Sequence, residues 1–328
     1  MQAPEYHLEL LEQKREAVET ALVAHVEAAE AGEHAEAMAL ARQVLLAGGK
    51  RWRPILILLT HQLAGGSNQG DGDVMPLALA FEMIHTATLV HDDINDGAKF
   101  RRNVATLHES YDSAQAIIAG DYLFVEGFGL GGRYDEQIVR LMANCCARIA
   151  SAELMQLRHV GNLATTPEDY YQIISGKTAG PFESGCEAAA LVAGASEQTA
   201  AILGIFGLEL GLAFQIVDDL LDLEGDQRMG KPRGTDVVEG KMTLPLIHSL
   251  TMSHGDSRSR LSEIIDNFDE SMWDELTNLL NATGSLDYAR TLVDNHLARA
   301  LDALLQFPQS DARDALEWLT CQVMDRHE

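Results

Sequence analysis

The stretch FEMIHTATLVHDDIND, residues 81–96, decides the fold class of this sequence. Its first part, FEMIHTATLV, is strongly apolar, and aspartates follow at positions 92, 93 and 96. Positions i and i+4 share one face of a helix, so Asp92 would lie beside Asp96. The stretch therefore predicts a largely buried helix that ends in a cluster of carboxylates.

The same five-residue pattern occurs again as DDLLD, with Asp218, Asp219 and Asp222 after the apolar run LGLAFQIV. Like charges at helical spacing repel, and a carboxylate beside apolar surface is costly unless it is paired. Bound cations would offset both costs, and carboxylate oxygens are ligands that suit Mg²⁺. A single DDxxD pattern could be a solvated acidic turn. Two of them, 126 positions apart, predict two helices that face each other across a metal-binding cavity.

The remaining composition favours an all-α fold. Only eight of the 328 residues are proline, good helix formers are abundant, and runs of alternating β-branched or aromatic residues are scarce. Apolar periodicity predicts helices over 5–31, 34–47, 54–64, 74–96, 111–128, 135–160, 167–194, 197–223, 243–253, 258–266, 270–281, 284–306 and 310–326. Residues 225–241 are irregular and charged, which indicates an active-site loop rather than a linker. We therefore expect one domain over residues 1–328.

Charge and cysteine content exclude several classes of protein. The net charge is −26, whereas nucleic acids and anionic lipids attract basic surfaces, so neither is an expected partner. The four cysteines lack metal-ligand spacing and indicate neither zinc nor disulfides. The N-terminus is too charged for a signal peptide, and no apolar run reaches about 18 residues. We expect a cytoplasmic protein without a membrane span.

Four of the six lysines stand next to glycine: Lys50, Lys177, Lys231 and Lys241. The lysine ammonium is a compact donor that suits phosphate. The alternative is that these Gly-Lys pairs mark helix ends, where lysine interacts favourably with the helix dipole. The SGKT sequence at 175–178 is not a P-loop, because the spacing of glycines and a preceding strand are missing.

Paired arginines accompany the first aspartate cluster, as RWR at 51–53 and as Arg101-Arg102. Arginine pairs suit multidentate contacts to a diphosphate, although Arg101 and Arg102 could merely neutralise the nearby aspartates. His85 lies seven residues before Asp92 on the same helical face. It is either a ligand contact or a buried structural histidine.

Seven blocks occur in order: GGKRWRP (48–54), IHTATLVHDDIND (84–96), FRRNVATLH (100–108), GDYLF (120–124), GKTAGPFE (176–183), FQIVDDLLDLEGD (214–226), and GKPRGTD (230–236) followed by EGKMTLPLIH (239–248). Together they resemble the trans-isoprenyl diphosphate synthase family, also called polyprenyl synthetases, and more its medium- and long-chain members. The resemblance implies an all-α isoprenoid synthase bundle around a deep cavity, usually as a homodimer. It also implies Mg²⁺-dependent condensation of isopentenyl diphosphate with an allylic diphosphate, namely geranylgeranyl or farnesyl diphosphate.

The resemblance assigns a role to each matching residue. The metal ligands would be Asp92, Asp93, Asp96, Asp218, Asp219 and Asp222, holding three Mg²⁺ ions when substrate is bound. Isopentenyl diphosphate would be held by Lys50, Arg53, His85 and Arg102. The allylic diphosphate would be held by Arg101, Lys177, Thr178, Gln215, Lys231 and Lys241. Of these, Lys177, Thr178 and Gln215 would join Asp92 and Asp218 in catalysis, and Asp236 would orient the loop lysines.

Two departures from the family pattern follow the first cluster. Asn103, Val104 and Ala105 stand where Gly, a basic residue and Pro are usual, and Gly97-Ala98-Lys99 stands where an acidic residue is common. Neither removes a metal ligand, but both affect the expected order of the loop and its affinity for substrate.

The rivals are a class I terpene cyclase, which DDLLD and GGKRWRP disfavour, and a noncatalytic partner subunit, which would tend to lose an aspartate cluster. A di-iron bundle would need Glu-x-x-His pairs, and none is evident.

In the family that this chain resembles, the residues one to three turns before the first DDxxD line the product cavity, so the resemblance implies that they set product length here. These are Ala87, Thr88, Ile84 and Phe81. Small side chains at 87 and 88 leave the product cavity open, whereas Phe81 is either a deeper floor or ordinary packing. Gly127 and Gly129 would widen the cavity if they face it. We expect a product of 25–40 carbons, with geranylgeranyl diphosphate synthase as the alternative.

Overall fold

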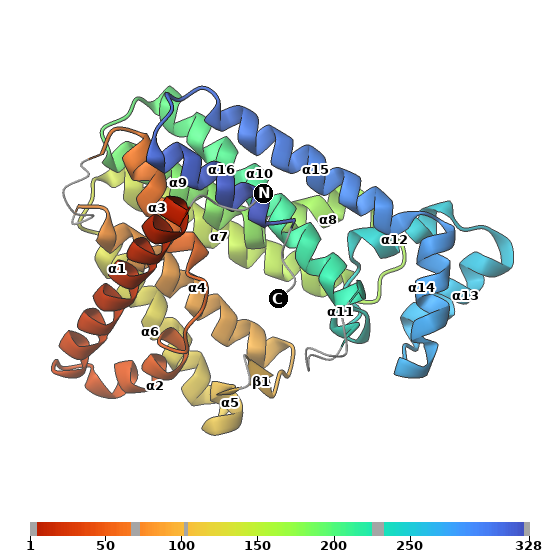
Figure 1. The fold of residues 1–328 in the computed structure, drawn as a ribbon. Coiled ribbons are helices and arrows are strands. Elements are labelled where there is room, and N and C mark those ends of the chain that lie inside the picture. The colour runs from red at the N-terminus through yellow and green to blue at the C-terminus, as the bar shows by residue number, and fades with distance from the viewer. Residues whose placement is uncertain (1–4, 67–72, 102–103, 225–232, 325–328) are drawn as a thin grey trace. The chain divides into compact units, whose positions relative to one another are not determined.

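The computed structural model describes residues 5–66, 73–101, 104–224 and 233–324, and helices dominate these ranges (Figure 1). A short hairpin also occurs, in which β1 (Phe100–Arg101) pairs antiparallel with β2 (Val104–Ala105). The predicted all-α class is confirmed. Contacts between residues divide the chain into two compact units, which are described one after the other.

Unit 1 comprises residues 1–146, 181–204 and 306–318. Its helices are α1 (Glu5–Glu30), α2 (Ala35–Leu45), α3 (Trp52–Leu63), α4 (Met75–Asn95), α5 (Leu107–Ser110), α6 (Ser113–Gly131), the first part of α7 (Glu136–His159), α9 (Gly180–Val192), the start of α10 (Glu197–Glu224) and most of α16 (Asp311–Gln322). Helix α4 is buried along most of its length, as its apolar sequence predicts. Its principal neighbour is α6, which runs beside it in Figure 1.

A glycine permits the close approach of α4 and α6. A Cβ atom on Gly127 would lie 3.0 Å from Ile84 Cγ1 and 3.1 Å from the Ala80 carbonyl oxygen, both on α4. Gly129 is exposed, and a Cβ atom there would meet nothing within 4 Å. Gly127 therefore lets two helices pack closely instead of widening a cavity, and Gly129 does not face α4.

Unit 2 comprises residues 147–180, 205–305 and 319–328. It contains the second part of α7, α8 (Pro167–Ile174), a π-helical turn (Ser175–Ala179), most of α10, α11 (Thr235–Val238), α12 (Leu244–Met252), α13 (Gly255–Asp266), η3 (Glu270–Met272), α14 (Trp273–Ala282) and α15 (Ser285–Leu304). Helix α8 begins with a capping box between Thr166 and Asp169. The helix predicted over 167–194 consists of α8, the π-helical turn and α9, so the turn interrupts its regular α-helical geometry. The predicted loop over 225–241 contains α11 in its second half, and 225–232 lie outside the described residues.

Helix α10 corrects one expectation about apolar runs. An 18-residue window within it has a mean hydropathy of 2.0, which is long and apolar enough to cross a membrane. The window is not an unbroken apolar run, because it contains Glu209. In the structure 61% of the window is buried inside the protein, and a helix buried on most sides is typical of a protein core. We therefore interpret α10 as a core helix.

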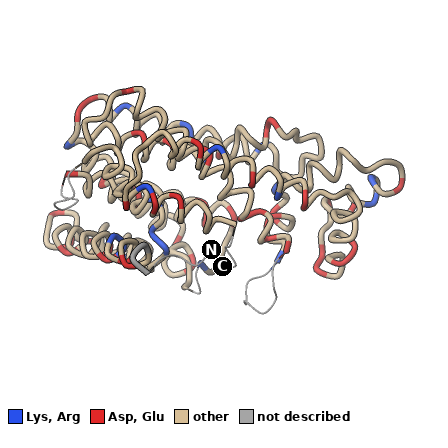
Figure 2. Tube along the Cα trace, turned by 45° about the horizontal axis from the view of Figure 1, so that its top comes forward, with Lys and Arg blue, Asp and Glu red and all other residues tan. Residues whose placement is uncertain are grey.

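Acidic residues are spread along the described helices, and lysine and arginine are fewer (Figure 2). Most of these carboxylates are solvated, as the excess of 50 acidic over 24 basic residues requires. The buried ones are therefore the informative exceptions. In unit 1 these are Glu82 and Asp93, and in unit 2 the clearest is Asp219.

Candidate active site

The first aspartate cluster lies where α4 ends. Asp96 is the C-cap of the helix, and Gly97 follows with φ of 63°. The Gly97 N–H donates to the Ile94 carbonyl (3.3 Å), and the Ala98 N–H donates to the Asp93 carbonyl (2.9 Å). This is a Schellman motif, which needs glycine at the left-handed position. The unusual Gly-Ala-Lys sequence after the cluster is therefore a helix stop.

The position of these carboxylates is electrostatically unfavourable. Asp92 and Asp93 lie in the last turn of α4, where the helix dipole already places negative charge. Burial raises the pKa of Asp93, and the nearby Arg101 guanidinium acts in the opposite direction. Arg101 Nε donates to Asp93 Oδ1 at 2.7 Å. The structure thus shows Arg101 neutralising an aspartate, the alternative left open by the sequence, and its contact to a diphosphate stays a prediction.

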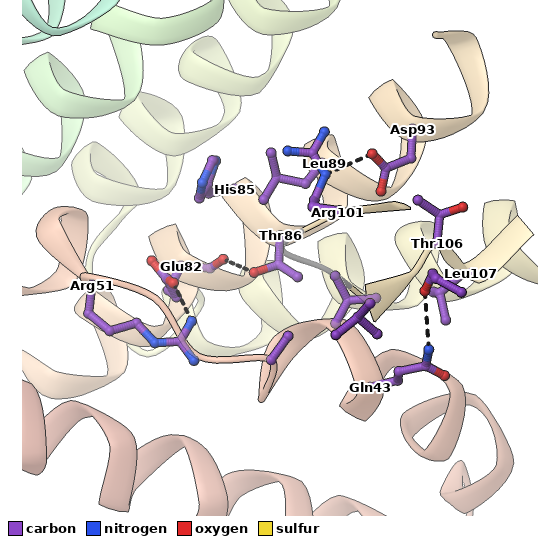
Figure 3. A pocket seen from close by; sticks show the side chains of 14 residues that line it. Gln43, Arg51, Glu82, His85, Thr86, Leu89, Asp93, Arg101, Thr106 and Leu107 are labelled. Carbon is purple, nitrogen blue, oxygen red and sulfur yellow. Dashed lines mark hydrogen bonds and ion pairs between the residues drawn. The ribbon is translucent and has the colours of Figure 1, made fainter. Parts of the chain in front are cut away.

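The β1–β2 hairpin places Arg101 beside the cluster. The Thr106 hydroxyl donates to the Ala98 carbonyl at 2.8 Å, which ties the end of the hairpin to the residue after the helix stop. A pocket opens next to this hairpin (Figure 3), lined by Gln43, Val44, Ala47, Arg51, Glu82, His85, Thr86, Leu89, Asp93, Arg101, Val104, Ala105, Thr106 and Leu107. Unit 1 therefore brings three predicted site residues, His85, Asp93 and Arg101, to one pocket.

Arg51 also lines this pocket; it belongs to the RWR pair expected to contact a diphosphate, but the family resemblance gave it no role of its own. Its Nε donates to Glu19 Oε1 (2.7 Å), its Nη1 to Glu82 Oε1 (2.6 Å) and its Nη2 to the Leu45 carbonyl (2.8 Å). It is buried and has φ of 52°, an unusual backbone conformation for a side chain of this size. Burial would lower the pKa of Arg51, but the two glutamates outweigh it and raise that pKa. The sequence marks the position of Arg51 only through the glycine pair Gly48-Gly49 that precedes it. In the structure both glycines have positive φ.

Two predicted contacts to isopentenyl diphosphate, Lys50 and Arg53, lie close to Arg51 in the chain. Lys50 is exposed. The Arg53 guanidinium lies 4.7 Å from the centre of the Phe182 ring, a cation–π contact that fixes the side chain. Arg102 lies outside the described residues. The assignment of these side chains to a substrate stays a prediction.

The second aspartate cluster lies at the end of α10 in unit 2. Asp218 is exposed, Asp219 is buried, and Asp222 is partly buried. The Asp222 carboxylate accepts hydrogen bonds from the backbone N–H groups of Thr235 and Asp236, both at 3.0 Å. Burial raises the pKa of Asp222, and these two N–H groups act in the opposite direction. Asp222 therefore holds the first turn of α11.

Asp219 is the centre of a hydrogen-bond network. The Tyr170 hydroxyl donates to its Oδ2 at 2.5 Å, and Gln215 Nε2 donates to its Oδ1 at 2.8 Å. The Thr178 hydroxyl in turn donates to Gln215 Oε1 at 2.7 Å. Burial raises the pKa of Asp219 to about 7, although the hydrogen bonds from Tyr170 and Gln215 lower it. Unit 2 thus joins the predicted Thr178, Gln215 and Asp219, together with Tyr170, which the sequence analysis missed.

Lys177 and Thr178 lie on the π-helical turn 175–179. Such turns are rare and frequently occur at functional sites. Lys177 Nζ forms an ion pair with Glu153 Oε2 (2.5 Å) and donates to Gln156 Oε1 (2.8 Å). Both partners lie on α7, so the ammonium is held against that helix.

The segment after α11 contains another predicted lysine. Lys241 Nζ pairs with Glu239 Oε2 at 2.5 Å, and the Lys241 backbone N–H donates to the Asp236 carbonyl at 2.8 Å. Burial and the neighbouring Asp219 and Asp222 raise the pKa of Asp236, whereas Lys241 acts in the opposite direction. Lys231 lies outside the described residues.

The charge balance of the second cluster fits a divalent cation. Burial raises the pKa of Asp219 and of Asp236, and the neighbouring aspartates raise both further, so the carboxylates gathered here repel one another and a divalent cation would relieve that repulsion. Within the described ranges, no three His, Cys, Asp or Glu side chains converge into a ready-made metal site. Mg²⁺ does not need one, because it retains water and binds substrate phosphates as well as one or two carboxylates.

The residues expected to set product length lie on α4. Phe81, Ile84 and Ala87 are buried, and the Thr88 hydroxyl donates to the His85 carbonyl at 2.7 Å. The Phe81 ring lies beside Gly185 of α9, where a Cβ atom would come within 3.7 Å of Phe81 Cδ1. Ordinary packing therefore accounts for at least part of the burial of Phe81.

Comparison with known proteins gives consistent matches. A family model described as polyprenyl synthetase matches residues 34–282. A short chain isoprenyl diphosphate synthase of Methanothermobacter thermautotrophicus is 35% identical over 86% of this chain and 88% of its own. An all-trans-nonaprenyl-diphosphate synthase (geranyl-diphosphate specific) of Rhodobacter capsulatus is 36% identical over 88% of this chain and 89% of its own. The crystal structure of a Caulobacter crescentus polyprenyl synthase, complexed with calcium and isoprenyl diphosphate, has a TM-score of 0.89 and 33% identity, covering 98% of both chains.

Proposed function

We propose a specific activity for this chain, which belongs to the polyprenyl synthetase family: it condenses isopentenyl diphosphate with an allylic diphosphate to a trans-polyprenyl diphosphate. The observation that carries this proposal is the hydrogen-bond chain from Thr178 through Gln215 to Asp219. It connects a rare π-helical turn, which also bears Lys177, to an aspartate cluster whose mutual repulsion a cation would relieve. A diphosphate chelated to a divalent metal would offer anionic oxygens to Lys177 and a cation to the aspartate cluster.

The residues present can supply what the reaction needs. The carboxylates of the two clusters, chiefly Asp92, Asp96 and Asp218, would hold Mg²⁺, which stabilises negative charge on the departing diphosphate. We propose three Mg²⁺ ions with substrate bound. The complex of the Caulobacter relative with calcium and isoprenyl diphosphate supports the use of a divalent metal. Lys177 and Arg101, now paired with carboxylates, would exchange these partners for diphosphate oxygens.

The covalent step follows from this charge distribution. The allylic C–O bond breaks, and the diphosphate leaves with the electron pair. The double bond of isopentenyl diphosphate supplies the electrons of the new C–C bond, and loss of one proton restores a double bond in a product five carbons longer. The released diphosphate is the proposed base. Water must be excluded because it would quench the carbocation, and each aspartate cluster follows a buried apolar stretch of its own helix, which suits that requirement.

We propose a product of 25–40 carbons, made from a farnesyl or geranylgeranyl diphosphate primer. The support is the small side chain of Ala87 and the modest one of Thr88, five and four residues before Asp92. Relatives of nearly equal identity carry short-chain and nonaprenyl names, so overall identity does not distinguish product lengths. Geranylgeranyl diphosphate synthase is the second candidate, because other relatives, at 32% identity, carry that name.

We also propose that the enzyme is a cytoplasmic homodimer. Helix α6 exposes three large apolar side chains, Ile117 (46%), Ile118 (55%) and Val125 (65%). Apolar residues grouped in this way on one helix are typical of a surface that another protein covers. Sedimentation analysis of the purified chain tests the oligomeric state.

Incorporation of labelled isopentenyl diphosphate by the purified protein tests the activity. We expect incorporation with an allylic primer and Mg²⁺, its loss on chelation, and its recovery when Mg²⁺ is restored. D92A and D218A should each lower the rate by at least about 10²-fold, whereas D274A, at an exposed position on α14, should not. Normal activity in both cluster variants would remove the metal assignment. No incorporation by the wild type alone would favour a noncatalytic partner subunit, and farnesyl diphosphate as the sole product would refute the proposed length.

A further inference from the structure

We propose that Tyr170 is a positioning residue for the second aspartate cluster: its hydroxyl fixes Asp219 in the orientation that links the cluster to the π-helical turn. This inference rests on the proposed function, because it concerns how the cluster receives metal and diphosphate. The sequence motifs give no role to Tyr170, which lies outside GKTAGPFE and both DDxxD patterns.

The geometry around Asp219 leaves its carboxylate little freedom. Tyr170 and Asp219 are both 4% exposed, and their hydrogen bond is short, at 2.5 Å. Gln215 Nε2 occupies the other carboxylate oxygen at 2.8 Å. With a donor on each oxygen, rotation of the carboxylate would break at least one hydrogen bond inside the protein. Carboxylates near metals are commonly oriented by such partners.

The same hydrogen bonds continue into the diphosphate-binding turn. Gln215 accepts from Thr178, so Tyr170, Asp219, Gln215 and Thr178 form one continuous chain of side chains. Tyr170 on α8 and Asp219 on α10 thereby fix Thr178 relative to the cluster. Lys177 is the neighbour of Thr178 on the same turn. A shift of Asp219 would therefore be transmitted to the residues expected to bind the allylic diphosphate.

The chemistry of the donor explains why a tyrosine suits this position. In the first cluster a cation, Arg101, pairs with the buried Asp93 and cancels its charge. In the second cluster the partners of Asp219 are neutral, a phenol and an amide. Neutral donors orient the carboxylate and compensate its lost hydration, but they leave its negative charge available to attract a metal ion.

The adjacent residue provides a matched control. Tyr171 also lies on α8, is partly buried and forms a hydrogen bond through its hydroxyl, in this case to His296 Nε2 at 3.0 Å. His296 bonds in turn to Glu209, so this second network involves no aspartate of the cluster. Y170F and Y171F each remove one phenolic oxygen and one hydrogen bond. Only Y170F should affect the metal site.

The test uses the full-length protein and a readout independent of turnover. Mn²⁺ is titrated in the presence of inorganic diphosphate, and free Mn²⁺ is followed by electron paramagnetic resonance. We expect Y170F to weaken Mn²⁺ binding about 3- to 10-fold, because one hydrogen bond to a charged group is lost. Y171F should stay within about twofold of wild type, and urea unfolding should show that both variants are folded. In steady-state kinetics Y170F should also raise the KM for the allylic diphosphate and shift the Mg²⁺ dependence of kcat to higher concentration.

A double-mutant cycle with D219N decides whether Tyr170 acts through Asp219. In the D219N background the additional effect of Y170F on Mn²⁺ binding should vanish. An equal loss in both backgrounds, or wild-type Mn²⁺ affinity in Y170F, would overturn the proposal while leaving the enzyme assignment intact. If the wild type itself fails to bind Mn²⁺ with diphosphate and to incorporate isopentenyl diphosphate, the proposed function fails instead.

Discussion

Replacing Gly127 with alanine should loosen the contact between α4 and α6, the helix pair that forms the centre of unit 1. The added Cβ atom would lie 3.0 Å from Ile84 Cγ1 and 3.1 Å from the Ala80 carbonyl oxygen. Both distances are about 0.3–0.4 Å shorter than an ordinary van der Waals contact. The Ile84 side chain can rotate, but the Ala80 oxygen belongs to the backbone, so the two helices must separate.

Two opposing effects set the change in the free energy of unfolding of G127A. Overpacking of this kind costs about 1–3 kcal/mol. Alanine in place of glycine inside a helix gains about 0.5–1 kcal/mol, because the unfolded chain loses conformational freedom. For G127A the net effect should be a loss of up to about 2.5 kcal/mol in the free energy of unfolding. Against a typical total of about 5–15 kcal/mol, this is readily measured.

G129A is the matched control, two residues further along α6. Position 129 is exposed, and a Cβ atom there meets nothing within 4 Å, so only the favourable helix term applies. Urea-induced unfolding of the two variants, measured side by side, should therefore show G127A to be less stable than G129A by about 1–3 kcal/mol. Equal stability of the two variants would refute the close packing inferred for Gly127.

Two further predictions concern other buried charges. R51M should lower the free energy of unfolding by about 3–5 kcal/mol, because it leaves the buried Glu82 carboxylate without its cation. E19Q, which changes the more exposed partner of Arg51, should lower it less. Urea unfolding of both variants checks this order. Burial raises the pKa of Glu209, but hydrogen bonds from His296 and Arg299 outweigh it and lower that pKa below its ordinary value. Its stabilising contribution is therefore present above the ordinary pKa and is lost as the pH falls through the lowered one. E209Q should be less stable by about 1–3 kcal/mol at neutral pH and should lose less stability on acidification, as thermal unfolding between pH 7 and pH 3 will show.

The sequence predicted the site residues best where chemistry and helical spacing coincide. Asp92, Asp93 and Asp219 lie at helix ends as predicted, because an apolar helix followed by DDxxD can place its carboxylates only there. The spacing could not show their partners. Arg101 reaches Asp93 through a two-residue hairpin, and such a short hairpin leaves no periodic signal in a sequence.

The sequence by itself determined the helical class, the two carboxylate clusters and the glycine-lysine pairs, because composition and helical periodicity are local properties. Tertiary structure alone decided which neighbours these groups have. The π-helical turn in SGKTA, the buried position of Arg51 and the hydrogen bond of Tyr170 to Asp219 join residues far apart in the chain or break a regular helix. Such features depend on the free energy of the entire folded chain, because each buried polar group needs a hydrogen-bond partner. No local sequence pattern encodes that partner.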